Sequence, residues 1–192
     1  LEKSLYGECF ARLLDHDGAV HFASEFVPAL EIWNRTPLLD RHVLKPILDA
    51  LEADPALELG CNISTDSLVN EAGWRPIRNQ LENRRHLNNR LVLEITETQP
   101  LSNIVTLRER IAEARELGCR VAIDDFGCGN IAPAQLLSLD VDIVKIDAVF
   151  VQNIKEGKGG ETSLHHMIGL ARCVSPHVVV EVIEDAAQLN SA

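Results

Sequence analysis

Arg120-Val-Ala-Ile-Asp-Asp-Phe-Gly-Cys-Gly-Asn130 is the stretch that decides the fold, because a short apolar run ends there in two adjacent carboxylates and a glycine-interrupted turn. Residues 121–123 are few and rich in β-branched side chains, which predicts a strand buried on both faces rather than a helix. Gly127 breaks the chain just afterwards. Asp124 and Asp125 therefore lie at the carboxyl end of a strand, the edge at which parallel sheets and barrels bind ligands.

The Asp124–Asp125 pair has two interpretations. Two neighbouring carboxylates repel each other, and keeping both ionised beside an apolar strand is costly unless a cation compensates. This favours a divalent-metal site. An isolated pair of aspartates could equally cap a helix before a surface loop, so the rest of the chain must decide.

The remainder of the chain alternates short apolar runs with longer amphipathic ones. Helical spacing dominates after Pro28, and residues 64–85 are helical or irregular. Further strands are expected at 5–10, 57–63, 91–95, 141–146 and 178–183, and helices at 101–117, 133–139 and 162–173. Strands separated by helix-length segments predict repeated βα units on a parallel sheet, an α/β fold.

Length and composition are those of one globular domain, residues 1–192. The formal net charge of −11 argues against binding long nucleic acid through its phosphates. Five cysteines form no C-x-x-C pair, which argues against a disulfide framework or a zinc site. No apolar run is long enough to span a bilayer. We expect a soluble cytoplasmic domain, which could also be the cytoplasmic part of a membrane-tethered parent.

Polar residues interrupt or end six of the expected strands. One such residue is readily explained by a structural ion pair, whereas six at comparable places predict that the side chains converge at one mouth of a barrel. Oxygen ligands without histidine or thiolate select Mg²⁺, Mn²⁺ or Ca²⁺. The residues are Glu8, Asn62, Glu94 with Glu97, Asp124 with Asp125, Lys145 with Asp147, and Glu181 with Glu184.

Two chemistries fit these residue types. Two metal ions could activate a water and neutralise a phosphodiester for in-line attack. One metal ion with Lys145 as a base could instead stabilise an enolate, as in enolase-type barrels.

The motifs, taken together and in order, resemble the EAL domain family of cyclic-di-GMP phosphodiesterases and related receptors. One such match is weak, but their order and spacing cover nearly the whole chain. The segment 22–31 resembles the family's F-I-P-x-x-E. The other matches are Glu8-Cys-Phe-Ala-Arg12 to E-A-L-x-R, Asn62-Ile-Ser64 to N-x-S, Glu94-Ile-Thr-Glu97 to E-x-T-E, Asp124-Asp-Phe-Gly127 to D-D-F-G, Lys145-Ile-Asp147 to K-x-D and Glu181-Val-Ile-Glu184 to E-G-V-E.

The resemblance implies a modified TIM (β/α)8-type barrel with an antiparallel first strand, here incomplete at both ends. It implies hydrolysis of cyclic-di-GMP to linear pGpG with Mg²⁺ or Mn²⁺ at a two-metal site. It also implies dimerisation through the loop after Asp125, and an N-terminal sensor or GGDEF-type domain in the parent protein.

Roles for individual residues follow from the same resemblance. Glu8, Asn62, Glu94 and Asp124 would hold one metal ion, and Asp125 and Asp147 would serve the second, with Asp124 bridging. Lys145 would hold the attacking water, Glu181 would act as ligand or general base, and Glu97 would steady the loop after Asp125. Arg12 would pair with a substrate phosphate through its planar fork, and Glu184 would lie near the guanine or brace the loop.

Departures from the family pattern support a second hypothesis. Val182 replaces the glycine of E-G-V-E beside Glu181, and Cys128 replaces the usual threonine. Both favour a receptor that binds cyclic-di-GMP with slow or no turnover. The intact set of acids favours the enzyme, and another divalent-metal barrel is a third, weaker alternative.

Overall fold

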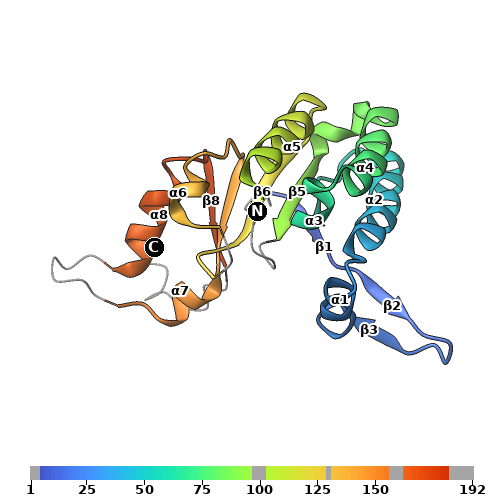
Figure 1. Ribbon diagram of the computed structural model, residues 1–192, viewed down its shortest axis with the longest axis horizontal. Coiled ribbons are helices and arrows are strands. Elements are labelled where there is room, and N and C mark those ends of the chain that lie inside the picture. The colour runs from blue at the N-terminus through green and yellow to red at the C-terminus, as the bar shows by residue number, and fades with distance from the viewer. Residues whose placement is uncertain (1–4, 97–102, 129–130, 156–161, 182–192) are drawn as a thin grey trace.

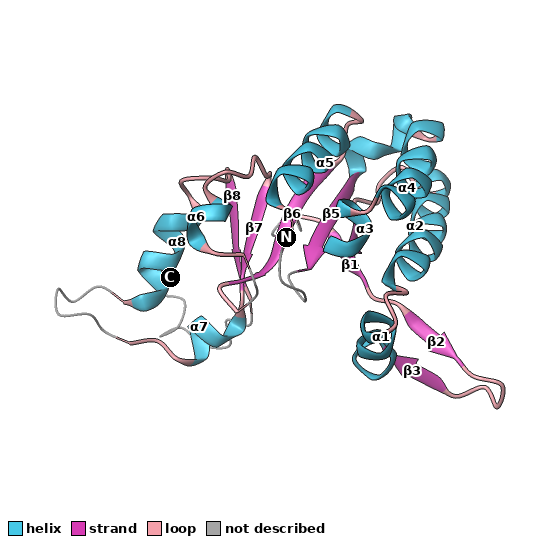
Figure 2. Ribbon diagram, viewed as in Figure 1, coloured by secondary structure: helices cyan, strands magenta, loops and turns pink. Residues whose placement is uncertain are grey.

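A curled sheet of six strands forms a half-barrel in the computed structural model, which describes residues 5–96, 103–128, 131–155 and 162–181 (Figures 1 and 2). The strand order is β1-β4-β5-β6-β7-β8, and all five pairings are parallel. The strands are β1 (Gly7–Cys9), β4 (Leu59–Ser64), β5 (Leu91–Thr96), β6 (Arg120–Phe126), β7 (Ile143–Ile146) and β8 (His177–Val180).

Helices connect these strands, as parallel pairing requires. The described helices are α1 (Ala23–Ile32), α2 (Thr36–Ala53), α3 (Thr65–Val69), α4 (Glu71–Asn83), the 3-10 helix η1 (Arg85–Arg90), α5 (Ile104–Glu116), α6 (Pro133–Leu136), α7 (Ala148–Gln152) and α8 (Ser163–Ala171). Their ends follow local chemistry. Asn103 accepts a hydrogen bond from the Thr106 N–H at the start of α5, and Gly118 takes a φ of 101° just after its end.

The sheet buries both faces, which explains its nearly continuous apolar strands. Alternate residues on one face pack with the helices in the main core; Ile63, Ile95 and Ile123 are examples. Trp74 of α4 is fully buried in the same core. The other face carries a second, small cluster centred on Val92 and Ala122 inside the half-barrel. Beyond that cluster, towards the carboxyl ends, this inner face becomes polar.

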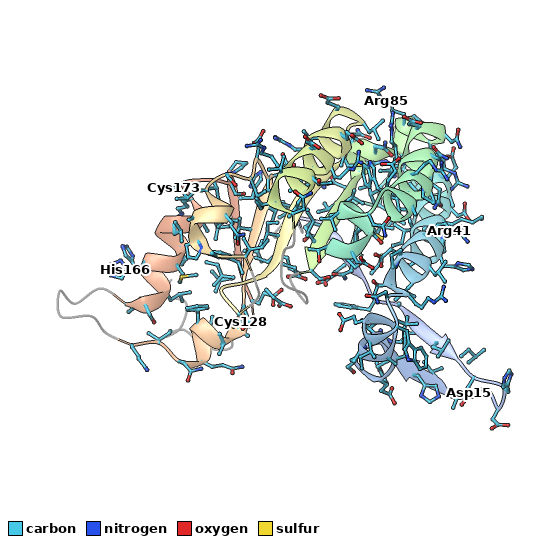
Figure 3. All side chains as sticks on the ribbon, in the orientation of Figure 1. Asp15, Arg41, Arg85, Cys128, His166 and Cys173 are labelled. Atoms are coloured by element: carbon cyan, nitrogen blue, oxygen red, sulfur yellow. The ribbon has the colours of Figure 1, made fainter. Side chains whose placement is uncertain are left out.

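A small unit projects from the body of the molecule. It consists of the antiparallel hairpin β2 (Arg12–Leu14) and β3 (Val20–Phe22), followed by α1 (Figure 1). Asp15 lies at the far tip, where its carboxylate accepts from the N–H groups of Asp17 and Ala19 (Figure 3). No residue of α1 is buried, and Trp33 just after it is 69% exposed.

The expected alternation of strands and helices is confirmed, and so is the α/β barrel-like fold. The antiparallel first strand is not confirmed, because β1, the first strand of the described sheet, is parallel to β4. Within the described ranges, no helix has the length and apolarity needed to cross a membrane.

Candidate functional site

Lys145 lies at the centre of a group of carboxylates inside the half-barrel. Its side chain is 6% exposed, and its ammonium is within ion-pair distance of four acids. The Nζ atom lies 2.9 Å from Glu94 Oε2, 2.9 Å from Asp124 Oδ1, 3.1 Å from Glu181 Oε1 and 3.3 Å from Glu8 Oε2. The predicted convergence of strand-end residues is thus present for these five.

Five different strands supply this cluster. Glu8, Glu94, Asp124 and Lys145 belong to β1, β5, β6 and β7, and Glu181 follows β8 directly. Side chains alternate between the faces of a strand, so each of these acids points inwards while its neighbours pack on the helices. Glu181 is fixed at the strand end because its backbone N–H donates to the Ile146 carbonyl.

The electrostatics reflect an excess of negative charge in a buried place. Burial raises the pKa of Glu94 to about 7, although its hydrogen bond from Lys145 lowers it, and the nearby Glu8 and Asp124 raise it further. Burial works against the charged form of Lys145, but its hydrogen bonds to Asp124 and Glu94 outweigh this and raise its pKa. Lys145 therefore stays protonated at neutral pH.

Asp125 has an unusual backbone that turns it away from the strand's regular course. Its φ is 52°, in the left-handed region that non-glycine residues rarely adopt, and the β6–β7 register shifts between Ile123 and Phe126. Burial, followed by the charges of Asp124, Glu181 and Asp147, raises the pKa of Asp125 to about 6. Such strained positions cluster at functional sites.

Asp147 and Asn62 lie at the border of the cluster. The Asp147 carboxylate caps α7 by accepting from the Val149 N–H at 2.6 Å, and Cys128 Sγ lies 3.4 Å from the same oxygen. Asn62 is the register partner of Glu94 on β4. No contact of Asn62 or Asp147 with the Lys145 ammonium is seen within the described residues.

A cavity of about 500 Å³ lies beside the cluster, a volume typical of small-molecule sites. Asn62, Thr96 and Asp125 line one side, and Phe10, Val27, Pro28, Leu39 and Val43 make the rest largely apolar. Asp40 holds this wall in place. Its Oδ2 accepts from the Ser64 N–H at 2.9 Å, from Ser64 Oγ at 2.6 Å and from Ser67 Oγ at 2.6 Å.

Tyr6 and Gly60 are site residues that the sequence did not reveal. The Tyr6 hydroxyl donates to Glu94 Oε2 at 3.1 Å, and burial, with the neighbouring Glu94 charge, raises the pKa of Tyr6. A Cβ on Gly60 would overlap Glu94 Oε1 and the Tyr6 ring. The available signal was the two-residue period, which places Tyr6 on the same face of β1 as Glu8.

The donor set fits hard divalent cations. Glu8, Glu94 and Asp124 each offer an oxygen within 4.8 Å of the others, and so do Asp124, Asp125 and Glu181. Glu94 Oε1 is buried without a hydrogen-bond partner among the described residues. One ammonium does not balance four carboxylates, and oxygen-only ligands suit Mg²⁺ or Mn²⁺.

Three predicted site residues are not placed in the cluster. Arg12 is exposed on β2, where its guanidinium lies 4.6 Å from the Phe22 ring centroid, and its Nη1 donates to the Ala11 carbonyl. Glu97 and Glu184 lie outside the described residues. The roles predicted for all three remain predictions.

Comparisons with known proteins agree on one family. The family model described as "EAL domain" matches residues 2–192. The chain is 34% identical over 190 residues to the "Probable cyclic di-GMP phosphodiesterase PdeA" of Escherichia coli K12, covering 95% of this chain and 26% of the relative. It is 27% identical over 186 residues to "Cyclic di-GMP phosphodiesterase PdeF" of the same organism, covering 94% of this chain and 25% of the relative.

Solved structures show the same fold. The FimX EAL domain of Pseudomonas aeruginosa bound to c-di-GMP matches with a TM-score of 0.79 and 25% identity, covering 96% of this chain and 75% of that one. The Vibrio cholerae LapD S helix-GGDEF-EAL structure matches with a TM-score of 0.81 and 21% identity, covering 98% and 46%. The chain spans about a quarter of the length of the two curated relatives.

Proposed function

The chain belongs to the EAL domain family, and from this premise we propose that it hydrolyses cyclic-di-GMP to linear pGpG with the help of Mg²⁺ or Mn²⁺. The observation that carries the proposal is the set of four carboxylates around Lys145, which combines buried charge with hard oxygen ligands. The names of the relatives PdeA and PdeF support the substrate.

We assign the metal ligands to the acids at the strand ends. Glu8, Asn62, Glu94 and Asp124 would hold one ion, and Asp125 and Asp147 would serve a second. Bound divalent ions would lower the pKa of a water and offset the charge of the phosphodiester. Two of these ligands, Asn62 and Asp125, also line the cavity, so a dinucleotide there would bring a phosphate to the cluster.

Lys145 and Glu181 are the groups that would act on the reacting atoms. Lys145 keeps its proton, so its ammonium can donate to the attacking water or to a phosphate oxygen without itself transferring a proton. Glu181, at 3.1 Å from that ammonium, is in a position to accept the proton of the water as general base. Arg12 is proposed to pair with a substrate phosphate, and Glu97 and Glu184 keep the supporting roles predicted for them.

The second candidate is a cyclic-di-GMP receptor with slow or no turnover. Val182 in place of glycine, directly after Glu181, favours it. The FimX structure was solved with c-di-GMP bound, which supports ligand binding in the family. In either case the location in the cytoplasm, a homodimer and a partner domain in the parent remain predictions.

Incubation with cyclic-di-GMP and Mn²⁺, followed by separation of the nucleotides, tests the proposal. We expect pGpG to accumulate, EDTA to stop the reaction, and Asp124→Asn to lower kcat at least 100-fold. Glu109→Gln, which removes one exposed carboxylate of α5, is the matched control and should leave kcat unchanged. Binding of cyclic-di-GMP without pGpG supports the receptor, and the absence of both binding and turnover contradicts both candidates.

A further inference from the structure

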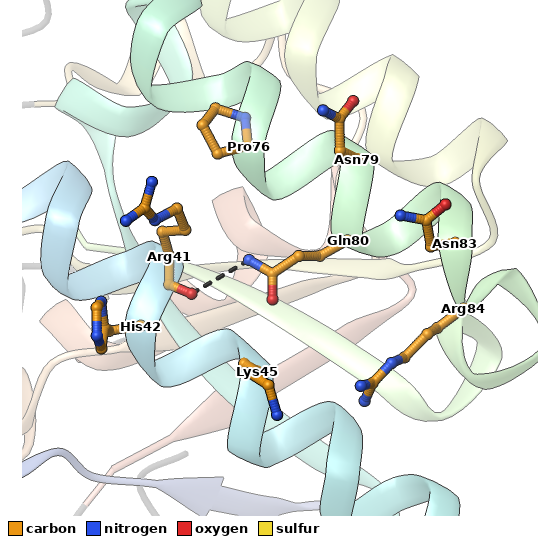
Figure 4. A pocket seen from close by; sticks show the side chains of 8 residues that line it. All are labelled: Arg41, His42, Lys45, Pro76, Asn79, Gln80, Asn83 and Arg84. Carbon is orange, nitrogen blue, oxygen red and sulfur yellow. Dashed lines mark hydrogen bonds between the residues drawn. The ribbon is translucent and has the colours of Figure 1, made fainter.

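A basic groove runs between α2 and α4 on the outer, helical side of the molecule (Figure 4). It encloses about 530 Å³ and is lined by Arg41, His42, Lys45, Pro76, Asn79, Gln80, Asn83 and Arg84. None of these residues contributes to the carboxylate cluster or to the cavity beside it. Arg41 lies on the outer surface of α2, one residue after the buried Asp40 (Figure 3).

The charge of this groove is opposite to that of the chain as a whole. Three permanent cations and no carboxylate line it, although the formal net charge of the protein is −11. Asp49 lies near one end and pairs with Lys45 Nζ and Arg84 Nη1, both at 2.6 Å. Arg41 makes no ion pair within the part of the chain that the structure describes, so its guanidinium is available to an anion.

The uncharged residues of the groove indicate what kind of anion it fits. Asn79, Gln80 and Asn83 carry carboxamides, which can donate to a peptide carbonyl and accept from a peptide N–H at the same time. Gln80 already makes such a contact, because its Nε2 donates to the Arg41 carbonyl at 3.1 Å. Pro76 adds an apolar wall. A phosphate compound offers acceptors alone and would leave the amide oxygens without donors.

We propose that this groove binds an acidic segment of a partner protein, with Arg41 pairing a glutamate or aspartate and the carboxamides holding the backbone beside it. Complementary charge supports this occupant. An acidic segment is repelled by most of the surface of a protein with net charge −11, so its binding must come from a local basic site. The proposal does not depend on the phosphodiesterase reaction.

Fluorescence anisotropy with the intact chain tests it. The probe is a fluorescein-labelled peptide of alternating glycine and glutamate with three glutamates, and the same peptide with glutamine is its uncharged control. We expect the glutamate peptide to bind, with affinity falling as salt rises, and the glutamine peptide to bind at least tenfold more weakly. No binding of the glutamate peptide up to 1 mM overturns the proposal, and so does equal binding of the two peptides.

Two charge-reversal variants locate the site. Arg41→Glu should weaken peptide binding at least tenfold. Arg75→Glu makes the same charge change at an exposed residue of α4 outside the groove and should change affinity less than twofold. Equal losses in the two variants would reduce the effect to net charge and contradict the groove.

Two further measurements guard the interpretation. Circular dichroism shows whether Arg41→Glu is folded, and Arg41→Gln, which adds no charge beside Asp40, should still weaken binding several-fold. Tripolyphosphate should bind more weakly than the peptide because it has no amide. Tripolyphosphate binding as tight as that of the peptide would overturn the assignment to a protein segment.

Discussion

Lys145 is the residue on which the candidate site depends, because it is the one cation facing four carboxylates within the described residues. Its hydrogen bonds to Asp124 and Glu94 offset part of a repulsion that burial would otherwise make severe. A neutral side chain at this position would leave Glu94 and Asp124 buried without a compensating charge.

Lys145→Met is therefore expected to destabilise the metal-free protein and to abolish turnover. Removing one partner of a buried ion pair costs about 3 to 5 kcal/mol, and Lys145 is 5% exposed. Urea unfolding in the presence of EDTA measures the loss. Lys155→Met, at an exposed lysine, should stay within about 0.5 kcal/mol of wild type. Equal stability of the two variants would contradict the central role of Lys145.

Asp40 gives a prediction about pH. Burial raises the pKa of its carboxyl, although hydrogen bonds from Ser64 and Ser67 lower it. An acid whose pKa is higher in the folded state binds its proton more tightly there, so ionised Asp40 costs stability above that pKa and protonation restores it.

Asp40→Asn removes this titration but keeps an oxygen that can accept from Ser64 and Ser67. Wild type should therefore gain stability relative to the variant as the pH falls from 7 towards 4. Urea midpoints at several pH values in this range measure the difference, from which the other titrating groups cancel. A constant difference over the range would show that Asp40 does not titrate with a raised pKa.

The sequence predicted most of the cluster, since Glu8, Glu94, Asp124 and Glu181 each interrupt or end an apolar strand, where burial demands a partner. It did not predict the hydrogen bond from Tyr6 to Glu94, because a tyrosine between a leucine and a glycine has no signal that separates a site residue from a packing residue. The contact of Asp40 with Ser64 spans 24 residues and joins a helix to a strand end, so no local pattern contains it.

At the scale of elements, the strands after residue 57 were predicted well because each is apolar and bounded by polar turns. The strand expected at 91–95 is observed at Leu91–Thr96, and the helix expected at 101–117 is observed at Ile104–Glu116. The hairpin of β2 and β3 was not predicted beyond its turn. Its strands have three residues each and no residue buried, so they carry no burial pattern.

The close approach of β4 and β5 at Gly60 predicts a strong effect of one methyl group. Gly60→Ala would push the Glu94 carboxylate and the Tyr6 ring apart. We expect a loss of about 1 to 3 kcal/mol in unfolding free energy, as for overpacked cores, together with a fall in kcat.

Gly169→Ala is the matched control for this substitution. Gly169 lies inside α8, and a Cβ there meets no heavy atom within 4 Å. Alanine favours a helix over glycine by about 1 kcal/mol, so this variant should be more stable than wild type. Thermal unfolding of both variants distinguishes the two sites, and a tolerated Gly60→Ala would contradict the packing seen around Glu94.

For the whole molecule, a bound divalent ion should appear as added stability. A ligand present at 100 times its dissociation constant adds about 2.7 kcal/mol, which for a chain of this size raises Tm by about 5 to 10 °C. Differential scanning calorimetry with MnCl₂ and with EDTA measures this. Asp124→Asn should lose most of the shift and Glu109→Gln none of it; an equal shift in both would place the ion elsewhere.

The two tryptophans lie in contrasting environments, and this gives the protein a built-in optical readout. Trp74 is fully buried and its indole N–H donates to Glu113 at 2.6 Å, whereas Trp33 is 69% exposed beside the projecting hairpin unit. Acrylamide, which is uncharged and so unaffected by the negative surface, should quench the red-shifted emission of Trp33 and spare the blue-shifted emission of Trp74. Any contact that covers the projecting unit could then be followed by fluorescence, without a label and separately from changes in the core.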